Sequence, residues 1–145
     1  MSSYAKPAAA TGIPCLRSRH ASAMIEWLCE AFGFEKHAVY ADGDLVQHPQ
    51  LTFGHRMVMP GSAGNASEWG GHIVQPDEID GRETQCCCIV VSDCAARYAQ
   101  AKAAGAEIVD AFETRDHGGS GYGCREPEGH LWWFGNYDPW VDQAA

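Results

Sequence analysis

The sequence has little positive charge. Ten Lys and Arg stand against nineteen Asp and Glu, which gives a net charge of −9 at neutral pH. A surface this acidic repels phosphate backbones and anionic lipid headgroups and attracts cations, so we expect no nucleic-acid partner and no membrane partner. Long apolar runs are missing too: no stretch approaches the roughly 20 residues of a membrane span, and the first residues lack the apolar segment of a secretion signal.

The cysteines lack the pattern of a disulfide framework. There are seven, an odd number, with no Cys-x-x-Cys pair and with Cys86, Cys87 and Cys88 consecutive. Neighbouring side chains on a strand point to opposite faces, so adjacent cysteines there do not readily bridge each other or share one metal ion. The triplet predicts a buried strand in which cysteine acts as a small hydrophobic residue, with a redox or metal site as the alternative. Reduced thiols predict a cytoplasmic protein.

What is present suffices for a packed core. The chain has 145 residues, of which 46% are hydrophobic and 20% are charged, as is typical of a folded globular protein. Folding at this length buries roughly two-thirds of the unfolded surface. Neither a disulfide nor a structural metal is therefore required for stability.

The same order of elements is expected twice along the chain. We predict a first module at 13–61 and a second at 86–140, with tails at 1–12 and 141–145 and a Gly- and Pro-rich connector at 62–85. Each module reads as strand, helix and three strands: 13–17, 20–32, 34–40, 45–53 and 56–59 in the first, and 86–91, 95–104, 106–112, 122–125 and 131–137 in the second. The prediction is an α+β fold of two βαβββ modules.

Several segments of this repeat resemble one known family. The segments are IPCLR, MIEWLCEAFGFE, LTFGHRMVMPGS, AAGAEIV and REPEGHLWWFGNYDPW, spread over about residues 13–140. They resemble the vicinal-oxygen-chelate superfamily, the fold of glyoxalase I, extradiol dioxygenases and bleomycin-resistance proteins. The resemblance implies that each module curls its mixed sheet into a cup. Two cups, within one chain or across a homodimer, would enclose a cleft for a small-molecule ligand.

The resemblance also implies where a metal would bind. Metal-dependent members carry four ligands on the first and last strands of each module, and those positions fall on Ile13, Met59, Cys86 and Trp133. A divalent centre needs oxygen and nitrogen donors with open coordination positions, and only Cys86 of these four can bind a metal. We therefore predict no metal ligands and no cofactor. A divalent metal held by unexpected residues such as His48, His72 and Cys86 is the disfavoured alternative.

Side-chain alternation then predicts what lines the cup. With Ile13, Cys86 and Trp133 inward, every second residue of their strands also faces inward, whereas Leu51 and Phe53 suit the face covered by the helix. Trp133 would form an aromatic sandwich with Trp69 or Tyr137. The predicted ligand-binding residues, to which Trp69 of the connector and Tyr122 are added, are Ile13, Arg17, His48, Gln50, Met57, Met59, Trp69, Cys86, Cys88, Tyr122, Trp133 and Tyr137.

Among the seven histidines, His48 is the best candidate for acid–base catalysis, because imidazole titrates near neutrality; a polar residue on a half-exposed strand is the alternative. His130 lies in a Glu-Gly-His turn, where the resemblance implies a structural histidine. The nearby Glu126 and Glu128 are expected in a solvated turn.

Two functions of different kinds follow. The first is a binding protein without metal that resembles the bleomycin-resistance proteins and sequesters a cationic or aromatic antibiotic or xenobiotic, with the charge of −9 attracting the ligand. The second is a glyoxalase-like lyase, isomerase or dioxygenase with a non-standard metal site or with acid–base work by His48. A protein whose cup is filled by its own side chains is a third reading. We favour the first.

Overall fold

The computed structural model describes residues 12–43, 45–63, 67–116 and 118–141, without the side chains of Ala41 and His48. It divides into two compact units, Met1–Gln75 and Pro76–Ala145. Each unit is treated by itself below. Among the described residues, no helix has the length and apolar character needed to cross a membrane.

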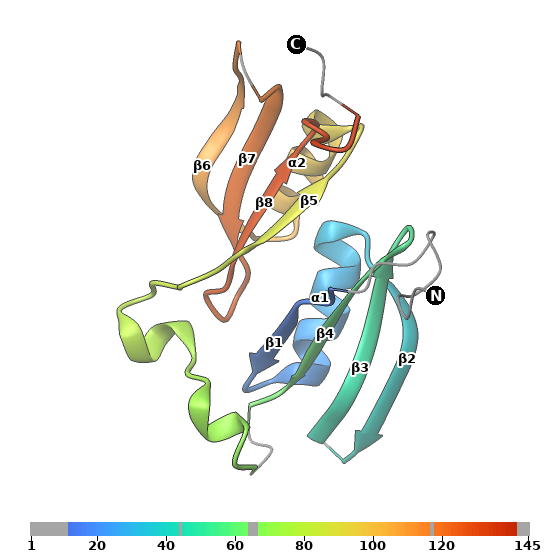
Figure 1. The fold of residues 1–145 in the computed structure, drawn as a ribbon, viewed down its shortest axis with the longest axis vertical. Helices are drawn as coiled ribbons and strands as arrows, with labels where there is room; N and C mark the ends of the chain where they lie inside the picture. Colours follow the sequence, from blue (N-terminus) through green and yellow to red (C-terminus); the bar gives the residue numbers. More distant parts are fainter. Residues whose placement is uncertain (1–11, 44, 64–66, 117, 142–145) are drawn as a thin grey trace, which may run out of the picture. The chain divides into compact units, whose positions relative to one another are not determined.

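The described part of the first unit holds a mixed sheet and an α-helix (Figure 1). Along the chain come β1 (Cys15–Ser18), α1 (Ala21–Phe32), β2 (Glu35–Asp42), β3 (Leu45–Phe53) and β4 (Arg56–Ser62). Their order in the sheet is β1-β4-β3-β2, with β1 parallel to β4 and the other pairs antiparallel. A short 3₁₀ helix, η1 (Gly70–His72), follows in the connector.

The second unit repeats this topology. After the 3₁₀ helix η2 (Pro76–Ile79) come β5 (Cys87–Val90), α2 (Cys94–Ala103), β6 (Glu107–Thr114), β7 (Ser120–Arg125) and β8 (Leu131–Gly135), in the sheet order β5-β8-β7-β6. The parallel pair is β5 with β8. The predicted α+β fold of two βαβββ modules is therefore confirmed, whereas the shared cleft between them stays a prediction.

Each helix covers one face of its own sheet and leaves the other face open. α1 contacts β1, β3 and β4, and α2 contacts β6 and β7. The apolar side chains that α1 buries recur at helical spacing: Met24, Ile25, Leu28, Ala31 and Phe32. The helix ends at Gly33, whose left-handed backbone (φ 82°) lets its N–H bond back to the carbonyl of Cys29. We call the uncovered side of each sheet its open face.

The burial of alternate residues distinguishes the two faces. In β4, Val58, Pro60 and Ser62 are buried against the helix side, and Met57 and Met59 between them are half-buried. In β8, Trp132 and Phe134 are buried, whereas Trp133 between them is half-buried. Met57, Met59 and Trp133 therefore lie on the open faces.

Candidate functional site

The open face of the first sheet is apolar at its centre. Cys15 is the partner of Met59 across the parallel β1–β4 pair, and Thr52 is the partner of Met57. Arg17 lies two residues along β1 from Cys15 and so shares this face. Its guanidinium reaches η1, where a Cβ added to Gly70 would lie 2.8 Å from Arg17 Nη1. A side chain at that position would require the guanidinium to shift.

The open face of the second sheet carries an indole ring that lies flat on the backbone. Added Cβ atoms would meet the Trp133 ring at 2.6 Å from Gly121, 3.2 Å from Gly123 and 3.1 Å from Gly135. Gly123 is the partner of Trp133 across β7–β8, and Gly121 is the partner of Gly135. Three glycines thus form a floor without side chains, and one face of the indole rests on it. We call this arrangement the Trp133 platform.

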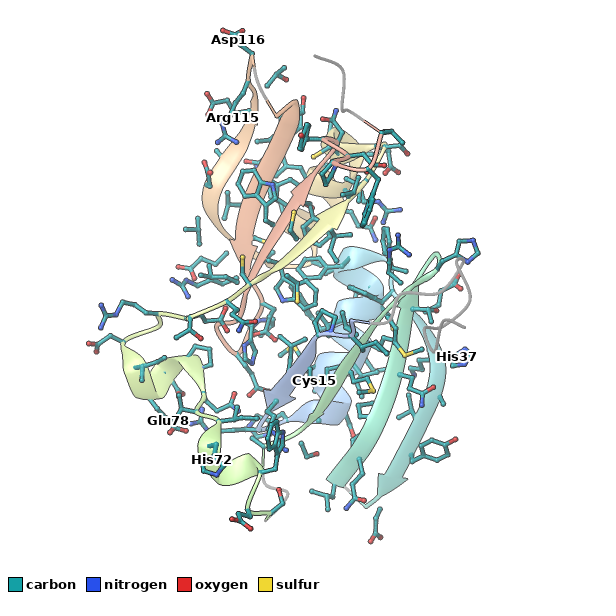
Figure 2. The ribbon with its side chains drawn as sticks, viewed as in Figure 1. Cys15, His37, His72, Glu78, Arg115 and Asp116 are labelled. Atoms are coloured by element: carbon teal, nitrogen blue, oxygen red, sulfur yellow. The ribbon has the colours of Figure 1, made fainter. Side chains whose placement is uncertain are left out.

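A cation covers the ring of the Trp133 platform. The guanidinium carbon of Arg115 lies 5.2 Å from the centre of the Trp133 ring, within the range of a cation–π contact. Two carboxylates hold this arginine: Arg115 Nη2 lies 3.2 Å from Asp110 Oδ2 and 3.7 Å from Glu113 Oε2. Arg115 comes directly after β6, at the end of the β6–β7 hairpin (Figure 2). The sequence analysis missed it, because its approach to Trp133 depends on the pairing of three strands.

Two of the predicted ligand-binding tyrosines lie elsewhere. Tyr122 has no exposed surface and stacks on Phe134 at 5.3 Å between ring centres, on the side of α2, where it also contacts Tyr98. It belongs to the core, and the prediction that it contacts ligand is wrong for this reason. Tyr137 lies beyond the end of β8 at Gly135, so the alternation that placed it inward does not reach it.

The cysteine triplet is more exposed than a buried strand would be. Cys86 and Cys88 are exposed, and Cys87 between them is half-buried. Cys88 is the partner of Trp133 and Cys87 is the partner of buried Trp132, so the side chains alternate between the two faces. Burial raises the pKa of the Cys87 thiol to about 11. The expectation of a fully buried strand is thus wrong for Cys86 and Cys88, because β5 is an edge strand whose open face carries no covering helix.

His130 takes part in a buried polar cluster at the start of β8. Its Nδ1 lies 2.6 Å from Glu83 Oε1, and the second oxygen of Glu83 accepts the N–H of Leu131 at 2.8 Å. Glu126 Oε1 accepts the N–H groups of Glu128 and His130. With 4% of its surface exposed, Glu126 is not the solvated residue that we expected. Burial raises the pKa of its carboxyl group, and the hydrogen bond from the His130 N–H opposes this shift.

Glu83 of this cluster also lines a shallow depression of about 350 Å³, together with Ile79, Arg82 and Thr84. None of these residues was predicted to contact ligand. Short connector segments of this kind show no periodicity from which such a position can be inferred.

The remaining predicted residues of the first unit are divided between its sheet and its connector. Gln50, in β3, is half-buried, and Ile13, just before β1, is 37% exposed. Trp69 precedes η1 and is 73% exposed. His48 lies in β3, but its side chain is outside the described residues. A sandwich of Trp69 with Trp133 would join the two units and stays a prediction.

The residues at the four metal-ligand positions do not fit a divalent metal. Met59 and Trp133 lie at corresponding places in the two sheets, each opposite a cysteine on the parallel edge strand. Thioether, indole and alkyl side chains supply none of the donors that such a centre requires. Among the residues that the structure describes, no three His, Cys, Asp or Glu side chains gather as a metal site.

Known proteins resemble the chain in sequence, in fold or in both. Residues 10–134 match the model of the Glyoxalase/Bleomycin resistance protein/Dioxygenase superfamily. Among solved structures, TioX from Micromonospora sp. ML1 is 26% identical, with 84% of this chain and 94% of that chain covered at a TM-score of 0.63. A glyoxalase-related enzyme from Fulvimarina pelagi is 17% identical (87% and 86% covered, TM-score 0.65).

A further solved structure is FosX, a genomically encoded fosfomycin resistance protein from Listeria monocytogenes, at 12% identity (90% and 95% covered, TM-score 0.63). At this identity the likeness concerns the fold alone. No curated protein has a matching sequence. Because the family model spans most of the chain and the two βαβββ units have the expected topology, the protein belongs to the Glyoxalase/Bleomycin resistance protein/Dioxygenase superfamily.

Proposed function

We propose that the protein binds a planar, cationic small molecule over Trp133, on the open face of its second sheet, without a divalent metal. The observation that carries this proposal is the Trp133 platform with a cation stacked upon it. The glycine floor fixes the indole flat against β7, and its other face already receives the guanidinium of Arg115. A face that attracts one cation suits a ligand cation of similar shape.

The charges around the ring support a cationic ligand. Asp110 and Glu113 face Arg115 and neutralise it. Should Arg115 swing aside, the same carboxylates would face the ligand's positive charge. The net charge of −9 raises the local concentration of cations around the protein and speeds their association.

Arg115 is a weakly held competitor for the ring. The side chains of Arg115, Asp110 and Glu113 are 37%, 48% and 63% exposed. Exposed ion pairs of this kind contribute about 0–1 kcal/mol each. A ligand with a planar aromatic body gains more from stacking and burial than the guanidinium does, so it displaces the arginine.

The family supports a proposal for the class of ligand. Its name includes the bleomycin resistance proteins, and FosX, with a similar fold, is described as a fosfomycin resistance protein. We therefore propose an antibiotic or another xenobiotic as the ligand, sequestered by a cytoplasmic homodimer. Light scattering on the purified protein tests the dimer separately.

Proflavine, a planar cation, is a suitable probe. We expect it to quench tryptophan fluorescence in a saturable way that survives EDTA. Trp133→Ala should abolish most of the binding, whereas Trp140→Ala, the control at a tryptophan that is 83% exposed beyond β8, should leave it unchanged. A naphthalene sulfonate of similar size serves as the anionic comparison.

Four results would overturn the proposal. Equal affinity for the anionic dye would show that the charge of the ligand does not matter. Unchanged binding by Trp133→Ala would show that the ligand does not stack on the Trp133 platform. A strict requirement for a divalent metal, or turnover of a substrate, would favour a glyoxalase-like enzyme instead.

A further inference from the structure

Two thiols lie exposed at the edge of the second sheet. Cys88 belongs to β5 and Cys86 directly precedes it; both are exposed, and Cys87 between them is half-buried. Cys87 is the partner of Trp132, which is 1% exposed in the core. Cys88, the partner of Trp133, lies on the open face, and Cys87 lies on the helix side. Cys86 directly precedes β5, and the alternation of the strand, continued by one residue, assigns it to the face of Cys88.

We propose that Cys86 and Cys88 form a two-thiolate site for a soft d¹⁰ cation, for which Cu⁺ is the best-suited ion. The proposal does not rest on the proposed ligand function. Although Cys88 is the partner of Trp133 on the same open face, the metal would bind thiolates and the dye would stack on the ring, so the two can fail separately.

The spacing of the two cysteines suits a bridging metal better than a disulfide. Residues two apart on a strand are separated by about 6.6 Å, and their Cβ atoms point the same way. A disulfide requires Cβ atoms about 3.5–4.5 Å apart. Two metal–sulfur bonds of about 2.3 Å each span up to about 4.6 Å between sulfurs, a separation that two thiols leaning toward each other can reach.

The number of donors selects the kind of cation. Within the described part of the chain, no third His, Cys, Asp or Glu joins the pair in a potential metal site. Structural zinc requires four ligands in a tetrahedron, and calcium and magnesium require oxygen donors. Thiolates favour soft ions such as Cu⁺, and a d¹⁰ ion imposes no geometry that two sulfurs could not satisfy.

Competition with the Cu⁺ chelator bathocuproine disulfonate tests the site on reduced, full-length protein under nitrogen. Loss of an outer partner of a metal site already costs about tenfold in affinity, so we expect Cys86→Ser and Cys88→Ser each to weaken binding by at least about tenfold. Cys15→Ser, at the exposed cysteine of β1, is the matched control and should stay within about twofold. Circular dichroism checks that each variant is folded.

Tryptophan fluorescence gives a second readout. Cys88 is the partner of Trp133, so Cu⁺ at the pair should quench that tryptophan, and Trp133→Phe should lose this quenching. The proposal is overturned if Cys15→Ser weakens binding as much as Cys88→Ser, or if both single variants bind like the wild type.

Discussion

Removal of Arg115 is the perturbation that most directly tests how the Trp133 platform works. In the structure, the guanidinium lies 5.2 Å from the ring centre and therefore covers the face that a ligand would need. The opposite face of the ring rests on Gly121 and Gly123. Any planar ligand must displace the arginine before it can stack. We expect Arg115→Ala to bind proflavine more tightly than the wild type.

The magnitude follows from the contacts of Arg115. A cation–π contact at a partly exposed site contributes about 0.5–1 kcal/mol, and the ion pair with Asp110 at 3.2 Å adds a few tenths of a kcal/mol, as is usual for exposed pairs. If about 1 kcal/mol favours the covered state, the ring is open in roughly 16% of molecules. The apparent affinity is reduced in the same proportion, so the substitution should increase it about sixfold.

Fluorescence titration with proflavine at fixed ionic strength measures the change. Arg56→Ala removes the same charge from an exposed position in β4 of the first unit, and it corrects for the general attraction of cations to a more acidic protein. Weaker binding by Arg115→Ala would refute the reasoning, since it would show that the guanidinium is part of the binding surface. Equal changes in proflavine affinity in both variants would show that the effect comes from net charge alone.

Three further predictions concern the second sheet and the cores. Gly121→Ala should destabilise the protein by about 1–3 kcal/mol through overpacking, because its Cβ would lie 2.6 Å from Trp133 Cζ2. In thermal unfolding, adding Trp133→Ala to the same chain should restore most of this lost stability. If it restores none, the strain does not come from the contact with Trp133. Burial raises the pKa of Glu126, so its folded pKa lies above the unfolded value of about 4.3 and stability decreases as pH rises through that window. Urea unfolding between pH 4 and pH 7 should show a smaller decrease in stability for Glu126→Gln than for the wild type. An unchanged pH dependence in the variant would assign the decrease to other groups. Leu28→Ala, at a side chain that is 1% exposed, should cost about 2–5 kcal/mol in urea unfolding, and a loss below 1 kcal/mol would contradict its place in the core.

The sequence predicts those parts of the fold that follow from local periodicity. The helix expected at 20–32 is observed at Ala21–Phe32, and the strand expected at 45–53 is observed at Leu45–Phe53. Both segments carry an apolar pattern and a stop signal within a few residues. The faces of Met57 and Met59 follow from alternation in the same way.

The residues that were placed wrongly lie where the pattern is interrupted. In β7, glycines surround Tyr122, so no apolar alternation shows which face its ring takes, and the structure buries it beside Phe134. Cys86 and Cys88 have an apolar sequence context, but the edge position of β5 leaves them exposed. Whether a strand lies at an edge depends on pairing with a distant segment, which local composition does not encode.

The glycine floor explains why the two open faces differ although the two sheets share one topology. Met59 and Trp133 occupy corresponding positions, each opposite a cysteine. Gly123 is the partner of Trp133 across the antiparallel pair. In the first sheet, Leu51 is the partner of Val58 and Thr52 is the partner of Met57, so the same register, continued by one step, places Gln50 opposite Met59.

A flat indole at position 59 would therefore meet the Cβ of Gln50. At the corresponding place, the second sheet offers glycine backbone without side chains. A flexible thioether avoids such a clash, because methionine adapts its rotamers to irregular space. The stacking surface thus requires the loss of side chains from β7 as much as the gain of an aromatic on β8. For this reason we propose aromatic ligand binding for the second module alone and not as a property that both modules share.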